Sequence, residues 1–148
     1  MAQLTGKTII ITGSSRGVGA DTAQILAAEG ANIVVNYRSK APRANKIVKA
    51  IEEAGGKAIA VQADVTNNED LQNLVNTAVE TFGSLDYLIL NASGGMETGM
   101  GEDYAMRLNR DAQLNLARLA AEKMPEGARI VFVTSHQAHF IREVETMD

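Results

Sequence analysis

The first apolar segment of the chain, residues 8–11, leads directly into a turn with three glycines, residues 12–19 (Thr-Gly-Ser-Ser-Arg-Gly-Val-Gly). A β-branched run of this kind is typical of a central strand in a parallel sheet that is covered on both faces. Apolar residues then recur at helical spacing as far as Ala27. A glycine turn between a strand and a helix directs backbone N–H groups at an anion, and the helix N-terminus adds a partial positive charge. Glycine-rich surface loops share this composition, but the flanking strand and helix predict a pyrophosphate site.

Each glycine of this turn has its own expected task. Gly13 lets the chain leave the strand in a conformation that a Cβ atom would obstruct. Gly17 lets the phosphates approach the backbone, and Gly19 lets helix and strand pack closely. The residues that we expect to bind the nucleotide here are Gly13, Ser14, Ser15, Arg16, Gly17, Val18 and Gly19.

Strand-like and helix-like segments alternate along the chain, which is the pattern of repeated βαβ units. Strands are expected at residues 8–11, 31–36, 57–62, 87–91 and 129–134. Helical apolar spacing is found within residues 18–27, 44–51, 71–82 and about 103–124. Pro42 suits the first turn of the second helix, and Thr66 with Glu69 has the spacing of a capping box before the third.

Right-handed crossovers place the five strands in the order 3-2-1-4-5, as in a Rossmann-type doubly wound parallel sheet of the α/β class. The first and fourth strands then flank the crevice where the winding reverses, at the carboxyl ends of the strands. Polar residues follow three of these ends, namely Thr12 after the first strand, Asn91 at the end of the fourth and Ser135 after the fifth. We therefore expect the chemically active residues to meet on one edge.

The last predicted helix carries two apolar stripes. The first consists of Ala105, Leu108, Ala112, Leu116 and Leu119, and the second of Leu114, Ala117, Ala121 and Met124. A helix with two apolar faces needs two partners. We expect the first stripe to cover the sheet and the second to pack on another subunit; a later part of the same polypeptide is the alternative partner.

Composition excludes several classes of function. The chain has 148 residues, of which 45% are hydrophobic, and this suits one globular domain. It has no cysteine, so a disulfide framework and a thiolate site are excluded, and its net charge of −4 argues against nucleic acid as the main ligand. The start of the sequence has no pattern of a signal peptide, and no apolar run approaches the length of a membrane span. A cytoplasmic location is therefore expected.

The octapeptide of residues 12–19 matches the TGxxxGxG turn of the short-chain dehydrogenases/reductases, and further motifs follow in register. These are Asp64-Val65 after the third strand, Asn91-Ala92 after the fourth, Asn109 in the long helix and Ser135 after the fifth strand. The chain resembles this family over its whole length, and within the family it is most similar to 3-oxoacyl carrier-protein reductases and related ketoreductases. The resemblance implies an oxidoreductase that transfers hydride between a nicotinamide dinucleotide and a ketone or alcohol. From the second apolar stripe of the last helix, we expect a homodimer or homotetramer.

The resemblance also implies roles for individual residues. Asp64 would accept the adenine amino group with Val65 beside the ring, although a simple turn aspartate before Thr66 is the alternative. Asn91, followed by Ala92 and Ser93, would lie against the cofactor ribose. The implied catalytic residues are Ser135, which would hydrogen-bond the substrate carbonyl, and Asn109, which would hold a water in a proton relay; solvent-facing helix polarity is the alternative for Asn109.

The end of the second predicted strand bears on the choice of cofactor. Its candidate binding residues are Asn36, Tyr37, Arg38 and Ser39. A carboxylate at this point accepts hydrogen bonds from both ribose hydroxyls of NAD and repels a 2′-phosphate, but none is present here. Arg38 offers a planar donor fork that suits a phosphate, and Arg16 can reach the same place. Each arginine alone is an ordinary surface residue, but together they favour NADP(H) over NAD(H).

The sequence departs from the family pattern in two places. The usual Asn-Asn-Ala-Gly is here Leu-Asn-Ala-Ser at residues 90–93, and the Gly/Met-rich stretch that follows is either an adaptable lid over an apolar substrate or a surface loop. The family's Tyr-x-x-x-Lys pair is expected at position 148 or just past it, and none of Tyr37, Tyr87 and Tyr104 is followed four residues later by lysine.

We therefore expect the chain to be the amino-terminal part of a longer enzyme, an NAD(P)-binding Rossmann domain over residues 1–148 without its carboxyl-terminal part and inactive alone. The alternative is a non-catalytic dinucleotide-binding module, either a redox sensor or a subunit that stabilises a catalytic partner. A metal site is not expected, because His136 and His139 have no third ligand placed by the sequence and follow a strand; they are interpreted as a polar pocket wall.

Overall fold

The structure is a computed structural model that describes residues 4–13, 17–39, 41–91, 102–133 and 142–144. Six strands form one sheet: β1 (Thr8–Ile11), β2 (Asn32–Tyr37), β3 (Lys57–Gln62), β4 (Tyr87–Asn91), β5 (Arg129–Val133) and β6 (Arg142–Val144). Four helices belong to the same part of the chain: α1 (Gly17–Ala28), α2 (Ala41–Glu53), α3 (Asn68–Phe82) and α4 (Glu102–Ala121).

The order of strands in the sheet is β3-β2-β1-β4-β5-β6, and β1 to β5 pair in parallel. This confirms the predicted order 3-2-1-4-5 and the Rossmann-type fold. The short strand β6 was not expected from the sequence; it pairs antiparallel with β5 through Ile130 opposite Val144 and Phe132 opposite Arg142. The edge of β5 that faces away from β4 offers backbone N–H and C=O groups, and β6 satisfies part of that edge.

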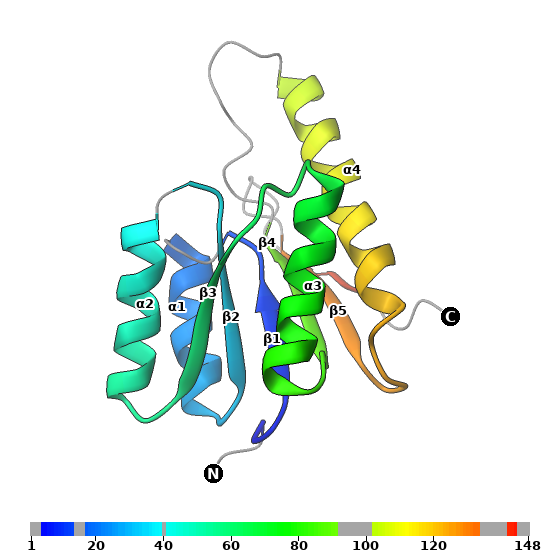
Figure 1. Cartoon of the computed structure of the whole chain (residues 1–148). Helices are drawn as coiled ribbons and strands as arrows, with labels where there is room; N and C mark the ends of the chain where they lie inside the picture. Colours follow the sequence, from blue (N-terminus) through cyan, green and yellow to red (C-terminus); the bar gives the residue numbers. More distant parts are fainter. Residues whose placement is uncertain (1–3, 14–16, 40, 92–101, 134–141, 145–148) are drawn as a thin grey trace.

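Helices cover both faces of the sheet (Figure 1), with α1 and α2 on one face and α3 and α4 on the other. Successive residues of a strand point to opposite faces. Ile9 and Ile11 accordingly pack with residues of α1 and α2, whereas Ile10 packs with residues of α3 and α4. All three side chains are buried, so β1 is apolar along its whole length, as the sequence predicted.

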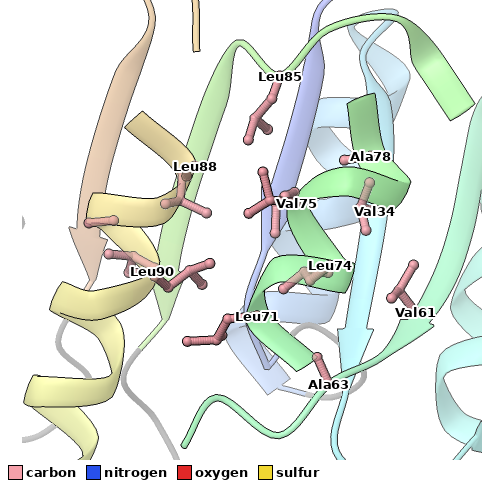
Figure 2. Close-up of a cluster of buried hydrophobic side chains, with 14 of the residues drawn as sticks. Val34, Val61, Ala63, Leu71, Leu74, Val75, Ala78, Leu85, Leu88 and Leu90 are labelled. Atoms are coloured by element: carbon pink, nitrogen blue, oxygen red, sulfur yellow. The ribbon is translucent and has the colours of Figure 1, made fainter. Parts of the chain in front are cut away.

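The cluster beneath α3 explains why this helix is the most clearly patterned segment of the sequence. Leu71, Leu74, Val75 and Ala78 are buried at spacings of three and four residues, and Figure 2 shows their side chains between α3 and the strands. Full burial of a leucine side chain contributes about 1.5–3 kcal/mol. The helix is therefore held firmly, and with it the turn that precedes it.

The start of α3 differs from the predicted capping box of Thr66 and Glu69. The N-cap is Asn67, whose backbone is extended and whose side-chain oxygen accepts a hydrogen bond from the Asp70 N–H at 3.0 Å. Thr66 precedes the N-cap, and its hydroxyl donates to Asp64 Oδ1 at 2.6 Å. The prediction was one residue out of register, and the correction places Thr66 beside a candidate site residue.

The second predicted stripe of α4 does not form a separate apolar face. Ala117 is 1% exposed because it lies in the core beside Leu116, and Met124 packs on the core beyond the last helical residue. Leu114 is 42% exposed and Ala121 is half-buried. The outer side of α4 therefore offers a smaller apolar surface than the sequence predicted.

The position of α4 relative to the sheet changes along its length. Ala112 and Leu116 are buried, so the second half of the helix covers the sheet as predicted. Figure 1 shows that the first half extends past the ends of the strands, on the side where β1 and β4 end. Within the described segments, no helix combines the length and the apolar character that a membrane span requires.

Candidate functional site

The turn after β1 begins as the sequence predicted. Gly13 has a φ of 61°, a conformation that side chains with a Cβ atom rarely adopt, and α1 begins four residues later at Gly17. The first N–H groups of α1 are therefore delivered to the edge where β1 ends. Residues 14–16, which include Ser14, Ser15 and Arg16, lie outside the described residues.

Asn36 ties the ends of three neighbouring strands together. Its Oδ1 accepts a hydrogen bond from the Gly13 N–H at 3.1 Å, and its Nδ2 donates to the carbonyl oxygens of Val61 at 3.4 Å and Ala63 at 3.3 Å. The side chain is 3% exposed. Asn36 therefore shapes the start of the glycine turn from inside the protein, and a contact between Asn36 and the cofactor stays a prediction.

On the other side of the turn, Thr12, Asn91 and Gln113 form a buried hydrogen-bonded group. The Asn91 N–H donates to Thr12 Oγ1 at 2.9 Å, and Gln113 Nε2 donates to the Asn91 carbonyl oxygen at 3.3 Å. Thr12 Oγ1 lies 3.4 Å from Gln113 Oε1 and 3.5 Å from the Asn91 carbonyl oxygen, either of which can accept its proton. Asn91 Nδ2 also donates to the Gly13 carbonyl oxygen at 3.5 Å. The ends of β1 and β4 are thus joined to α4.

Gln113 is a residue that the sequence reasoning missed. The two predicted apolar stripes include its neighbours Ala112 and Leu114 but not the glutamine between them. Its spacing from Leu116, Ala117 and Ala120 is that of a single helical face, and all four residues are buried. A polar residue in an otherwise apolar stripe is the signal that could have found it.

Arg38 and Asp64 meet at the far end of the same edge. Arg38 Nε lies 4.0 Å from Asp64 Oδ2, and the two side chains are 73% and 38% exposed. Gln62 Nε2 donates to the Arg38 carbonyl oxygen at 3.2 Å, which holds the backbone at this point. Ser39 is also exposed, whereas Tyr37 packs against the apolar cluster under α1 and α2. The cation is therefore accessible to a ligand and lies beside a carboxylate.

Asp64 is fixed in place by its neighbours. Its Oδ1 accepts hydrogen bonds from the Thr66 N–H at 2.9 Å and from the Thr66 hydroxyl, and its own N–H donates to Asp70 Oδ2 at 2.9 Å. The hydrogen bonds from the Thr66 hydroxyl and then the Thr66 N–H lower the pKa of Asp64 below its ordinary value of 3.8; partial burial opposes this and Arg38 assists it. At neutral pH Asp64 is therefore a carboxylate that can only accept hydrogen bonds.

The structure brings six of the candidate residues into two clusters and places four others in helices. Gly13, Asn36 and Asn91 meet around the end of β1, and Arg38 meets Asp64 beyond the end of β2, with Val65 packed on the core next to it. Gly17, Val18 and Gly19 form the first turn of α1, and Asn109 lies in α4. Outside the described residues are Ser14, Ser15, Arg16, Ala92, Ser93, Ser135, His136, His139 and the Gly/Met-rich stretch.

In the part of the chain that the structure covers, no group of three His, Cys, Asp or Glu side chains is arranged to hold an ion. What the edge does offer is a glycine turn at a helix N-terminus, an anionic acceptor and an exposed guanidinium. That combination, at the switch point of a doubly wound sheet, defines a dinucleotide-binding fold.

Comparison with known proteins identifies the family. Residues 7–146 match the family described as short chain dehydrogenase, and the chain belongs to it. An uncharacterized oxidoreductase of Methylorubrum extorquens is 41% identical over a 142-residue alignment that covers 91% of this chain and 57% of that protein. Versicolorin reductase 1 of Dothistroma septosporum is 38% identical over a 142-residue alignment that covers 92% of this chain and 54% of that protein.

A solved structure agrees with these relatives. The crystal structure of a short chain dehydrogenase from Burkholderia cenocepacia J2315 in complex with NADP has a TM-score of 0.79 and 38% sequence identity, and covers 88% of this chain and 56% of its own. The chain thus spans about half the length of the relatives it matches.

We predict that Thr66→Val raises the pKa of Asp64 toward its ordinary value of 3.8, because the hydroxyl that donates to Asp64 Oδ1 is removed. Since the native pKa is depressed, the stability that the carboxylate contributes is present above pH 3.8 and is lost as the pH falls through the native pKa. Carboxyl-selective NMR titration of the intact protein measures this shift. Thr81→Val, on the exposed side of α3, is the matched control; an Asp64 pKa equal in the wild-type protein and Thr66→Val would contradict the explanation.

Proposed function

We propose that the intact protein is an NADP(H)-dependent oxidoreductase that transfers hydride between the nicotinamide and a ketone or alcohol substrate. The observation that carries the proposal is the turn after β1. Gly13 has a positive φ there, and α1 begins four residues later, at the edge where β1 and its neighbour β4 end. Membership of the short chain dehydrogenase family supports the same activity. In this proposal, residues 1–148 belong to a single NAD(P)-binding domain.

The residues on this edge fit a dinucleotide. The turn of residues 13–19 would hold the pyrophosphate, Asp64 would accept from the adenine amino group, and Arg38 would bind the 2′-phosphate. When bound, the nicotinamide supplies or accepts the hydride. Ser135 would donate a hydrogen bond to the substrate oxygen and Asn109 would hold a water for proton transfer.

Two tyrosines can be set aside as proton donors. Tyr37 packs against the apolar cluster under α1 and α2. Tyr87 is the first residue of β4, at the end of the strand opposite to Asn91 and the candidate site. The proposal therefore assigns no proton transfer to either of them.

Turnover by the intact protein tests the activity. We expect NADPH oxidation with at least one member of a panel of ketones, followed by the loss of nicotinamide absorbance. Ser135→Ala should lower kcat by about 100-fold or more, because a positioned hydrogen-bond donor to the reacting oxygen is lost. The Kd of NADPH in calorimetry should change much less, and Asn73→Ala on the exposed side of α3 is the control.

The outcomes of that experiment separate the alternatives. Unchanged turnover in Ser135→Ala would remove this serine from the mechanism. Heat of NADPH binding without turnover of any ketone would favour the non-catalytic dinucleotide-binding module. Absence of both heat and turnover would overturn the proposal as a whole.

The preference for NADP(H) over NAD(H) is a separate part of the proposal. It is supported by the exposed guanidinium of Arg38 after β2 and by the absence of any carboxylate in residues 36–39. The related enzyme from Burkholderia cenocepacia was crystallised with NADP, which is consistent with the same preference.

We predict that Arg38→Asp weakens NADPH binding about 10- to 100-fold, because a charge-assisted hydrogen bond to the phosphate is replaced by repulsion. NADH, which has no 2′-phosphate, should lose little or no affinity. Calorimetry with both cofactors measures the two losses. Arg43→Asp on the exposed side of α2 makes the same change in net charge and should leave both affinities unchanged; equal losses for NADPH and NADH in Arg38→Asp would refute the assignment.

Self-association and location complete the proposal. We propose a homodimer or homotetramer, acting on a small-molecule carbonyl or alcohol, with no nucleic acid or membrane partner. The exposed Leu114 and the half-buried Ala121 on the outer side of α4 support contact with another subunit. A cytoplasmic location is a further part of this proposal.

We predict that Leu114→Asp shifts the intact protein toward smaller species in analytical ultracentrifugation at micromolar concentration, because a charge would have to be buried in the contact. Ile25→Asp is the matched control, since Ile25 is an exposed apolar residue on α1 at 65% exposure. A wild-type protein that sediments as a monomer, or an equal effect of both variants, would defeat the proposed contact.

A further inference from the structure

Gln113 is a polar residue on the buried side of α4. It is 3% exposed, and Leu116, Ala117 and Ala120 share its side of the helix at spacings of three, four and seven residues. An apolar side chain at this position would pack against the sheet without any desolvation cost. A buried amide is tolerated only when its donor and acceptor are both hydrogen-bonded. The partners of Gln113 therefore indicate what the residue does.

Both polar atoms of the amide are used, and the hydrogen bonds close into a ring. The Asn91 N–H donates to Thr12 Oγ1, the Thr12 hydroxyl can donate to Gln113 Oε1, and Gln113 Nε2 donates back to the Asn91 carbonyl oxygen, over 2.9, 3.4 and 3.3 Å. Three segments far apart in the sequence take part. The ring therefore fixes α4 against the end of β4 and the first residue after β1.

This ring lies on one side of the glycine turn, and Asn36 lies on the other. Asn36 holds the Gly13 N–H from the direction of β2 and β3, where Arg38 and Asp64 are found. Gln113 holds Thr12 and Asn91 from the direction of β4 and α4. The Asn36 hydrogen bonds on the adenine side thus have no member in common with the hydrogen bonds of Gln113.

Gln113 also sits where α4 leaves the sheet. Asn109 comes four residues earlier, about 6 Å along the helix axis and on the same side of the helix. Gln113 is bonded to Asn91, the last residue of β4, and Figure 1 shows that the first half of α4 extends past the strand ends. The hydrogen bonds of Gln113 therefore set both the rotation and the height of the turn that carries Asn109.

We propose that Gln113 is a positioning residue for the hydride-transfer end of the site, acting through Asn91 and through the turn of α4 that carries Asn109. The inference rests on the proposed function. It adds that the geometry of the reacting end, and not the affinity for the dinucleotide, depends on the ring formed by Gln113.

Gln113→Met in the intact protein tests this inference, because methionine fills the same volume but cannot close the ring. With NADPH and the ketone that the wild-type protein turns over fastest, we expect kcat and the single-turnover rate of NADPH oxidation to fall about tenfold or more, since small misplacements of a reacting group are costly. The Kd of NADPH in calorimetry should change less than about threefold, because the hydrogen bonds of the Gly13 N–H and carbonyl oxygen to the Asn36 and Asn91 side chains do not pass through Gln113. Leu116→Met, a change of similar size on the same buried side of α4, should leave both quantities within about twofold.

Thr12→Val tests the same ring from its other end. The combined loss of rate in the double variant should be much smaller than the product of the two single losses, because either substitution alone opens the ring. If Gln113→Met is poorly folded by circular dichroism, Gln113→Asn replaces it, since an amide one methylene shorter cannot reach both partners.

The inference is overturned by any of three results. The first is a folded Gln113 variant with wild-type rates. The second is a loss of rate accompanied by an equal loss of NADPH affinity or reproduced by Leu116→Met. The third is failure of both Gln113 variants to fold, which would make the residue part of the fold alone. A wild-type protein without NADPH binding or turnover would instead overturn the proposed function.

Discussion

The hydrogen-bonding needs of the backbone at the end of β1 govern the rest of this structure. The ladder to β4 ends with the bond from the Thr12 N–H to the Ile89 carbonyl oxygen at 3.0 Å, and the chain must then turn away with a positive φ at Gly13. Backbone groups that leave the ladder at such a point lose their strand partners. Here side chains replace them, Asn36 for the Gly13 N–H and Asn91 for the Gly13 carbonyl oxygen. The shape of the glycine turn therefore depends on amides from two neighbouring strands.

Neutral and charged groups are divided between the inside and the outside of this edge. Asn36, Asn91 and Gln113 are buried and hydrogen-bonded to backbone groups, so they add rigidity without a buried charge. Arg38 and Asp64 lie further out, where solvent screens their interaction and where a charged ligand can reach them. Buried, hydrogen-bonded amides thus hold the backbone at this edge, and the charged side chains lie where solvent and a ligand can reach them. This arrangement is suited to reversible binding of a polyanion.

The sequence was sufficient to predict the strand order and the apolar faces of the helices, because both follow from periodicity and from the handedness of crossovers. Leu71, Leu74 and Val75 are buried as the helical spacing required. The predicted N-cap of α3 was wrong because two neighbouring residues can both fill that position. Thr66 and Asn67 are both good capping residues. In the structure Asn67 accepts from the Asp70 N–H at the N-cap, and the Thr66 hydroxyl donates to the carboxylate of Asp64.

The candidate site was predictable in its location and less so in its internal contacts. The ends of β1, β2 and β4 meet at one edge in any sheet of this order, so Gly13, Asn36 and Asn91 could be named in advance. That the Asn36 amide reaches Ala63, and that Gln113 reaches Asn91, depends on strand register and helix height. Neither quantity is encoded in local spacing, so the contacts of Asn36 with Ala63 and of Gln113 with Asn91 were not predicted.

The hydrogen bonds of Gln113 join α4 to the sheet at the point from which the first half of the helix extends past the strand ends. The helix begins at Glu102, eleven residues earlier, or about 16 Å away along the axis. The turn that carries Asn109 is closer, about 6 Å from Gln113, and a tilt of about 5° there would move it by about 0.5 Å, which is about the tolerance of a catalytic group. An angular error at one glutamine is thus converted into a positional error beyond the sheet.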